Sequence, residues 1–314
     1  MRLPVTVIAG YLGAGKTTLI NQLLRNNEGW RLAVLVNEFG ELPIDSELIE
    51  AQGNGVISIS GGCVCCAFGS DLIGALDGIK ALDPPVDHVL IEASGVALPG
   101  SIIASVGLVD GLRADAVVVL ADAEQIRRNA TDPYLGDTIL RQLAQADIML
   151  LTKSDLVTNE ERSRLLDWLR SKAPQARLLP VSHGEVPISA VVGALPVPAR
   201  GRKPAADAHG QFSSLVLTPG RPIDVRRLAQ ALADDPGVTR AKGFVLTEAG
   251  LVLLHVVGHR YSVEAATGDH SIGVVCIGLK GRLDVARLNR AKSDAEVAAR
   301  PVFQANRAIL PNPE

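Results

Sequence analysis

Short apolar runs recur along the first part of the chain, separated by longer stretches compatible with helices. The runs are rich in valine, isoleucine and leucine, which is typical of strands buried on both faces of a sheet. Helices are predicted between them, for example over Ser70–Leu82 and Asn159–Lys172. This alternation predicts an α/β fold, a mostly parallel sheet flanked by helices, with ligands at the carboxyl ends of its strands. The predicted strands are Val5–Ala9, Arg31–Val36, Gly55–Ser60, Asp87–Glu92, Ala116–Ala121, Ile148–Leu151 and Arg177–Val181.

The pattern changes after residues 196–210, which hold three prolines and lack periodicity. We interpret this stretch as an exposed linker. Strands in succession with two helices follow it, which indicates a small C-terminal α+β domain. We therefore predict a first domain over residues 1–195 and a second over residues 211–314. The strands predicted in the second domain are Phe212–Leu217, Val238–Leu246, Leu251–Val257 and Ile272–Ile277, and the helices are Asp224–Asp234 and Asp284–Ala291.

A glycine-rich loop joins the first predicted strand to a helix. Its spacing, Gly10-x-x-x-x-Gly15-Lys16-Thr17, is that of the phosphate-binding loop of P-loop proteins. Glycines let backbone N–H groups turn towards an anion, and the helix N-terminus adds its positive end. Lys16 is expected to reach the β- and γ-phosphates, and the Thr17 hydroxyl to bind Mg²⁺. The predicted phosphate-binding residues are Gly10, Gly13, Ala14, Gly15, Lys16, Thr17 and Thr18.

Acidic residues follow two other strands. Glu92 ends a strand, where P-loop proteins place the carboxylate that orients Mg²⁺ or its waters. Gly95 follows and is placed to turn a backbone N–H towards the γ-phosphate. Glu38 and Glu41 occupy the polar loop after the second strand, where a switch segment approaches Mg²⁺, although a solvated loop explains Glu41 almost as well. We take Lys16, Glu38 and Glu92 as catalytic candidates, and Thr17, Glu38 and Glu41 as metal-binding candidates.

The segment Thr152-Lys-Ser-Asp155 follows the strand Ile148–Leu151. A carboxylate there can accept hydrogen bonds from N1–H and N2–H₂ of guanine together, a pair that adenine does not offer. An ordinary helix cap at Ser154 or Asp155 is the alternative interpretation. Behind a phosphate-binding loop we favour base recognition, so GTP is the predicted nucleotide and its base contacts are Thr152, Lys153 and Asp155.

Three of the four cysteines lie within four positions, at Cys63, Cys65 and Cys66, after two glycines and before a helix. A helix N-terminus lowers the pKa of a nearby thiol and favours the metal-binding thiolate. Sulfur ligands favour Zn²⁺, Cu(I) or Co²⁺, and three of them leave a tetrahedral site one ligand short, which suits metal transfer. Buried small residues or a redox pair are the alternatives. Cys276 lies in an apolar strand and is predicted to be core.

Composition limits the remaining function classes. The 314 residues are 47% hydrophobic with a formal charge of −3, so nothing indicates attraction to nucleic acid or a membrane surface. No apolar run approaches the ~20 residues that span a bilayer, and we expect a cytoplasmic protein. The histidines are scattered: His88 begins a strand at the edge away from the nucleotide, and His255 and His259 are expected to be structural.

Taken together, these residues resemble the CobW-type metallochaperone GTPases, a P-loop family related to the nickel-insertion GTPases of urease and hydrogenase maturation. The resemblance implies a GTP hydrolase that binds Zn²⁺ or Co²⁺ at the three cysteines and delivers it to a client metalloenzyme or metal-cofactor enzyme. It leaves a homodimer open. Thr152 departs from the asparagine usual in the guanine motif, and the histidine-rich stretch of many relatives is absent from the sequence. The matching segments are Gly10–Thr18, Val36–Gly40, Gly62–Cys66, Glu92–Gly95, Asp122, Thr152–Asp155 and Arg240–Phe244.

Two other classes share parts of this pattern. A small-molecule kinase of the P-loop class would need an arginine-rich lid and an acceptor pocket, and the sequence indicates neither. A nucleotide-gated redox switch would join the cysteines in a disulfide. Retention of metal under reducing conditions separates that switch from the metallochaperone.

Overall fold

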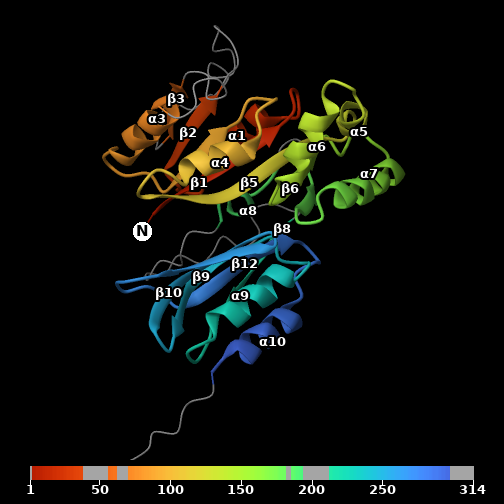
Figure 1. Cartoon of the computed structure of the whole chain (residues 1–314). Coiled ribbons are helices and arrows are strands. Elements are labelled where there is room, and N and C mark those ends of the chain that lie inside the picture. Colours follow the sequence, from red (N-terminus) through yellow and green to blue (C-terminus); the bar gives the residue numbers. More distant parts are fainter. Residues whose placement is uncertain (1, 38–55, 62–69, 182–184, 194–211, 298–314) are drawn as a thin grey trace, which may run out of the picture.

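The computed structural model describes residues 2–37, 56–61, 70–181, 185–193 and 212–297. Within these ranges the strands form two sheets, which lie one above the other in Figure 1. The upper sheet contains seven strands and the lower sheet five. The predicted linker, 196–210, falls outside the described residues, so the domain boundary stays a prediction.

The upper sheet is parallel throughout, with the strand order β3-β2-β4-β1-β5-β6-β7. Every strand predicted for the first domain is present, which confirms the α/β class. Parallel neighbours need a crossover connection, and helices supply those that the described residues contain. The strands are β1 (Leu3–Gly10), β2 (Leu32–Asn37), β3 (Val56–Gly61), β4 (His88–Glu92), β5 (Leu112–Asp122), β6 (Ile148–Thr152) and β7 (Arg177–Pro180).

Helices cover both faces of the upper sheet because its strands are apolar on both sides. In β1, Val5, Val7 and Ala9 face one core and Ile8 faces the other. The first core contains residues of α3, α4, α5, α6 and α7, and the second contains residues of α1 and α8. These helices are α1 (Lys16–Arg25), α3 (Ser70–Lys80), α4 (Pro99–Val106), α5 (Ile126–Ala130), α6 (Gly136–Ala144), α7 (Asn159–Lys172) and α8 (Ile188–Val192).

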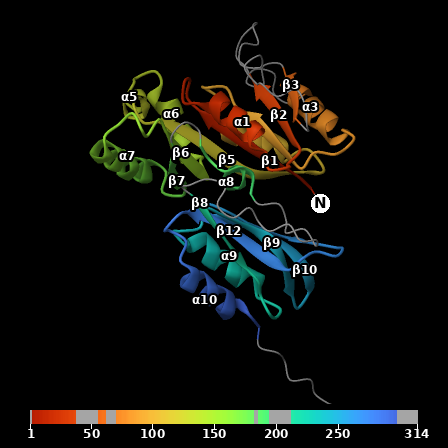
Figure 2. The same cartoon turned by 180° about the vertical axis from the view of Figure 1, so that it is seen from behind.

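The lower sheet is antiparallel, in the order β11-β10-β9-β12-β8. Helices α9 (Val225–Asp234) and α10 (Val285–Ala295) cover its face away from the upper sheet, as Figures 1 and 2 show from opposite sides. Cys276 faces these helices and is fully buried, as predicted, and burial raises its pKa to about 12. The strands are β8 (Phe212–Leu217), β9 (Arg240–Thr247), β10 (Gly250–Val257), β11 (Arg260–Ala265) and β12 (Gly273–Leu279).

The two sheets share one hydrophobic core. Val275 and Ile277 of β12 point away from α9 and α10 and pack in the same cluster as Ile188 and Val191 of α8. Helix α8 itself lies between the two sheets (Figure 1). The lower sheet is therefore fixed to the upper one by apolar burial, which is the dominant favourable term in packing.

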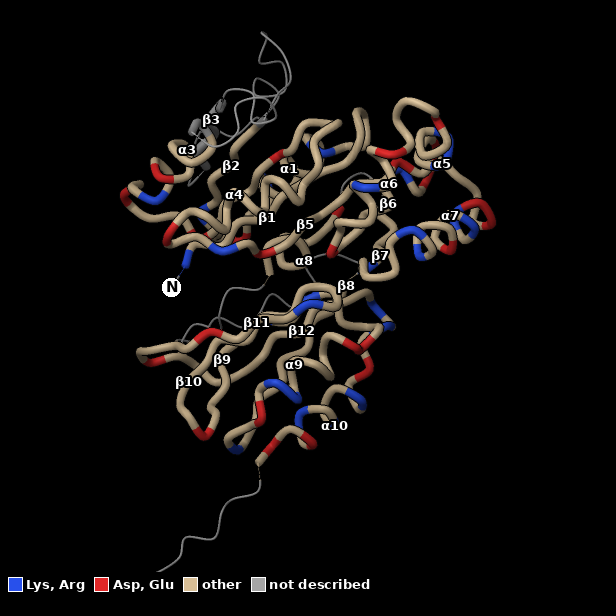
Figure 3. The backbone as a smooth tube through the Cα atoms, in the orientation of Figure 1, with Lys and Arg blue, Asp and Glu red and all other residues tan. Residues whose placement is uncertain are grey.

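The outer surface carries charges of both signs. Figure 3 shows basic and acidic residues interspersed over α7 and α10. On α7 the pairs are exposed and within one helical turn, for example Arg164–Glu160 at 2.6 Å. Within the described ranges, every helix is too short or too polar to cross a membrane.

Candidate functional site

The glycine-rich loop runs from the end of β1 to the start of α1, the strand–loop–helix arrangement that its motif predicts. Gly10, Gly13 and Gly15 have φ values of 136°, 75° and 96°, in the region that favours glycine. A Cβ at Gly10 would lie 2.5 Å from the carbonyl oxygen of Leu120, whereas at Gly13 and Gly15 it would meet nothing within 4 Å. The loop therefore needs glycine for its backbone path, and the space above it is open to an anion.

Strand pairing brings Glu92 to this loop. The register Ile8↔Glu92 between β1 and β4 places the carboxylate at the carboxyl edge of the sheet, where it is 2% exposed. The Thr17 hydroxyl donates a hydrogen bond to Glu92 Oε1 at 3.1 Å. Lys16, the first residue of α1, is buried beside them. Hydroxyl and carboxylate oxygens are the ligands that Mg²⁺ prefers, so the donor set fits that ion.

Gly95 lies against the phosphate-binding loop. A Cβ there would come within 2.7 Å of the Leu12 side chain. The buried Gln142 of α6 fixes this segment, since its Nε2 donates to the carbonyl oxygens of Gly95 at 3.1 Å and of Ala97 at 2.9 Å. Gln142 was not identified from the sequence. The sequence feature that could have identified Gln142 is its position directly before Leu143, on the side of α6 that faces the core.

The segment after β6 is bonded to the loop. Thr152 Oγ1 donates to the carbonyl oxygen of Ala14 at 2.9 Å, across 138 positions of sequence. Lys153 adopts a φ of 54°, rare for a non-glycine residue, and its Nζ lies 2.7 Å from Asp122 Oδ2. Asp155 is exposed. The threonine that departs from the usual motif thus connects the two segments directly.

A cavity of about 230 Å³ lies between these two segments. Its floor includes Leu120 and Leu150 from the ends of β5 and β6. Apolar walls with a few polar groups at the rim are typical of small-molecule sites. Its polar rim, formed from the predicted nucleotide residues, is Thr18, Thr152, Lys153 and Asp155, with Ala14 and Gly15 beside them.

The remaining predicted site residues lie outside the described residues: Glu38, Glu41, Cys63, Cys65 and Cys66. The described ends of the flanking strands are nonetheless at the same edge as Thr17, because β2, β3 and β4 are parallel neighbours. Within the described ranges, no group of three or more histidine, cysteine or acidic residues could hold a metal ion.

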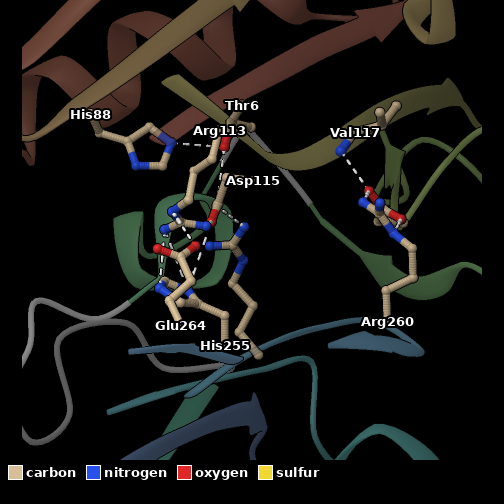
Figure 4. A network of polar contacts seen from close by, with 10 residues as sticks. Thr6, His88, Arg113, Asp115, Val117, His255, Arg260 and Glu264 are labelled. Carbon is tan, nitrogen blue, oxygen red and sulfur yellow. Dashed lines mark hydrogen bonds and ion pairs between the residues drawn. The ribbon is translucent and has the colours of Figure 1, made fainter. Parts of the chain in front are cut away.

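The opposite edge of the upper sheet carries a buried charge network against the lower sheet (Figure 4). Asp115 of β5 is its centre: Arg240 donates to its Oδ2 at 2.5 Å, Arg113 to its Oδ1 at 3.1 Å and Thr6 to its Oδ2 at 3.4 Å. Burial would raise the pKa of Asp115, but Arg240 and its neighbours hold that pKa well below the usual range. This network was not identified from the sequence.

Two histidines border the network, both in structural positions. His88 is hydrogen-bonded to Thr6 Oγ1 at 2.8 Å, and His255 lies 3.0 Å from Arg113 through its Nε2. Burial lowers the pKa of His88 to about 3 and that of His255 to about 2. Both imidazoles are therefore uncharged at neutral pH, so Asp115 is balanced by arginines.

A second ion pair connects the sheets nearby. Arg260 of β11 binds the Asp147 carboxylate, which also accepts from the Val117 backbone N–H at 2.7 Å (Figure 4). Arg177 of β7 donates to the carbonyl oxygens of Ala233 at 2.6 Å and Asp235 at 2.7 Å. These contacts join the edge of the parallel sheet at which β6 and β7 begin to the lower domain.

A phosphate-binding loop after the first strand of a parallel sheet, facing a cavity at the carboxyl edge, defines a P-loop nucleotide-binding protein. Residues 4–180 match the family described as CobW/HypB/UreG, nucleotide-binding domain, and residues 212–295 match the cobalamin synthesis protein cobW C-terminal domain. The chain belongs to the CobW/HypB/UreG family.

The sequence identity to individual relatives is low. The chain is 33% identical over 225 residues to the zinc chaperone CobW of Pseudomonas aeruginosa, covering 61% of this chain and 60% of that protein. It is 29% identical to the zinc chaperone YjiA of Escherichia coli, covering 73% of this chain and 75% of that protein. The solved Zn(II)-bound YjiA GTPase from E. coli has 24% identity and a TM-score of 0.45, covering 95% of this chain and 100% of that one. The chain spans 60% and 62% of the lengths of the two CobW zinc chaperones that it matches.

Proposed function

We propose that this protein hydrolyses GTP with Mg²⁺ and couples its nucleotide state to delivery of zinc to a client metalloenzyme or metal-cofactor enzyme in the cytoplasm. The cavity between the phosphate-binding loop and residues 152–155 carries the proposal. Its rim holds residues that two separate sequence motifs predicted for one nucleotide. Relatives named zinc chaperones and zinc-regulated GTPases support zinc as the cargo, with cobalt as the alternative.

The phosphate end of this site needs charge and fixed geometry rather than covalent chemistry. The loop N–H groups and the Lys16 ammonium bind the β- and γ-phosphates. Mg²⁺, held by Thr17 with Glu92 beside it, would neutralise the charge that develops on the phosphates. Gln142 holds the Gly95 carbonyl and so fixes the segment after β4 against the phosphate-binding loop.

Residues 152–155, at the end of the site where we place the base, should determine which nucleotide the protein prefers. Asp155→Asn should weaken GTP binding by roughly tenfold or more and erode the preference over ATP, because an amide cannot accept both guanine N–H groups. Titration of the protein with fluorescent GTP and ATP analogues measures both affinities. Asp137→Asn, which removes an exposed carboxylate paired with Arg141, is the control and should leave both unchanged. Equal affinity of the parent protein for GTP and ATP would show that residues 152–155 do not read the base.

We place the metal cargo at Cys63, Cys65 and Cys66, with Glu38 and Glu41 on the neighbouring loop. The support comes from the strands around them: β2 ends at Asn37 and β3 at Gly61, paired in register and next to β4. Loops that leave from these ends start at the edge where Thr17 and Glu92 meet. A γ-phosphate that orders one loop can thereby change the ligand set of the other.

The cargo site predicts a spectroscopic result. Reduced protein should bind about one Co²⁺ with sulfur-to-metal charge-transfer absorption, and replacement of all three cysteines by serine should abolish that absorption, since oxygen is a poor substitute for thiolate. Nucleotide affinity should survive the change. Cys276→Ala is the matched control, because that thiol is fully buried in the lower sheet. Undiminished Co²⁺ affinity in the triple-serine protein would place the cargo site elsewhere.

A further inference from the structure

A larger cavity, of about 420 Å³, lies between the two sheets at the edge opposite the phosphate-binding loop. Pro4, Trp30 and Val86 line it from the upper domain and Leu253 of β10 from the lower one. Small-molecule sites are typically 300–1,000 Å³, largely apolar, and often located between domains. The cavity meets the conditions of volume and position, six of its fourteen lining residues are charged, and nothing in the proposed GTP and zinc chemistry uses it.

The charged residues of this cavity have a positive surplus. Four are basic and two are acidic: Arg2, Lys80, Arg113 and Lys242 against Asp87 and Glu264. Both acids already have partners. Glu264 lies 3.6 Å from Arg113, and Asp87 accepts a hydrogen bond from the backbone N–H of Arg31 at 2.9 Å. A backbone N–H leaves the charge of Asp87 in place, while Lys80 pairs with Asp77 at 2.9 Å and Arg113 with Asp115 at 3.1 Å. Among the described residues, the basic groups of the cavity outside any ion pair are therefore Arg2 and Lys242.

Lys242 is the group that most needs a ligand. Its side chain comes from β9 and is only 7% exposed. Among the described residues it makes no hydrogen bond or ion pair, and its Nζ lies 5.6 Å from the centre of the Trp30 ring. Burial lowers its pKa to about 8, so the ammonium form still predominates at neutral pH. The ammonium already makes a cation–π contact with Trp30, and an anion in the cavity would add the hydrogen-bonding partner that the described residues do not supply.

We propose that this interdomain cavity binds a small organic anion, with its carboxylate or phosphate on Lys242 and its apolar body against Trp30 and Pro4. Trp30, which is 3% exposed, and the buried Pro4 give the cavity wall an apolar patch, and the ammonium over the Trp30 ring suits a single anionic group. The acidic wall formed by Asp87 and Glu264 disfavours a highly charged anion. The ligand class is thus an amphipathic monoanion or dianion rather than a nucleotide.

Such a ligand would contact both domains without contacting GTP. Pro4 is near the start of β1 and Gly10 at its end, so the two sites are separated by about 20 Å of strand. Because Lys242, Leu253 and Glu264 belong to the lower sheet and the other lining residues to the upper domain, a bound anion would hold the two together. It would raise the melting temperature as its concentration rises.

Trp30 supplies a local signal for the test. The chain has two tryptophans, so a Trp168→Phe background leaves Trp30 as the fluorophore. Benzoate, 2-naphthoate, acetate and inorganic phosphate are titrated into this protein. We expect saturable changes in fluorescence and a higher melting temperature with 2-naphthoate and benzoate, and weaker binding of acetate. Phosphate binding as tight as that of naphthoate would show that charge alone selects the ligand and would overturn the assigned class.

Lys242→Met keeps the length of the side chain and removes its charge, and it should weaken 2-naphthoate binding at least tenfold. Lys280→Met, at an exposed position, is the control and should bind as the parent does. If Lys242→Met does not fold, Lys80→Met at the cavity wall replaces it, with a loss of about threefold expected. Undiminished affinity in the folded lysine variant, or no saturable signal from any of the four anions in the parent, would overturn the proposal.

Discussion

Replacement of Lys16 by alanine should reduce the rate of GTP hydrolysis by roughly a hundredfold or more. The lysine is buried at the first position of α1, so its ammonium is held where charge accumulates on the β- and γ-phosphates. Fixed charge in a site sheltered from water stabilises a transition state strongly, and no other lysine or arginine of the described residues belongs to this loop. Phosphate release at saturating GTP and Mg²⁺ measures the effect.

The control for this change is Lys172→Ala, which removes a charge from the exposed end of α7 and should leave the rate unchanged. Circular dichroism of both variants checks that the fold is retained. Turnover at the parent rate in a folded Lys16→Ala protein would exclude the phosphate-binding loop from the mechanism.

Asp115→Asn should lower the free energy of unfolding by about 3–5 kcal/mol, the usual cost of breaking a buried ion pair. The substitution keeps the shape of the side chain but leaves Arg240, whose side chain is 2% exposed, without its carboxylate. Arg113 loses the same partner and keeps the more distant Glu264 and the uncharged His255. Urea denaturation followed by circular dichroism measures the change.

Glu160→Gln is the matched control, because it breaks an ion pair of the same kind on the surface. Arg164 and Glu160 are 67% and 74% exposed, and exposed pairs within one helical turn contribute about 0.3–0.5 kcal/mol. If the two variants lose similar stability, the network at Asp115 does not stabilise the contact between the sheets.

The features that sequence predicted are those set by local pattern. Apolar β-branched runs identified the parallel strands, and the phosphate-binding motif located its loop, because strand, turn and helix N-terminus are contiguous in the chain. Thr152 and Ala14, by contrast, were each predicted to bind the nucleotide, but no contact between the two residues was predicted. Their hydrogen bond depends on the order of β1, β5 and β6, which no local pattern specifies.

Long-range charge pairing accounts for most of what the sequence analysis missed. The strand β5 was predicted to start at Ala116 but starts at Leu112. Its first residues include Arg113 and Asp115, charged side chains that are typical of a solvent-exposed segment. Asp115 is buried here because Arg240, 125 positions away in the sequence, pairs with it. The whole of β11 was also missed. It is an edge strand, mostly exposed, and its alternating polar residues include Arg260 and Glu264, which pair with the other domain.

The shared core around α8 has a consequence for how the protein is made. A ribosome releases the upper sheet and α8 about 80 residues before β12, a delay of about 4–16 s at ordinary rates of synthesis. During that interval the apolar side chains that Val275 and Ile277 later cover are open to other nascent chains. The vulnerable period of this protein therefore falls in the later part of its own translation, and a stall between α8 and β12 would leave these side chains uncovered for longer.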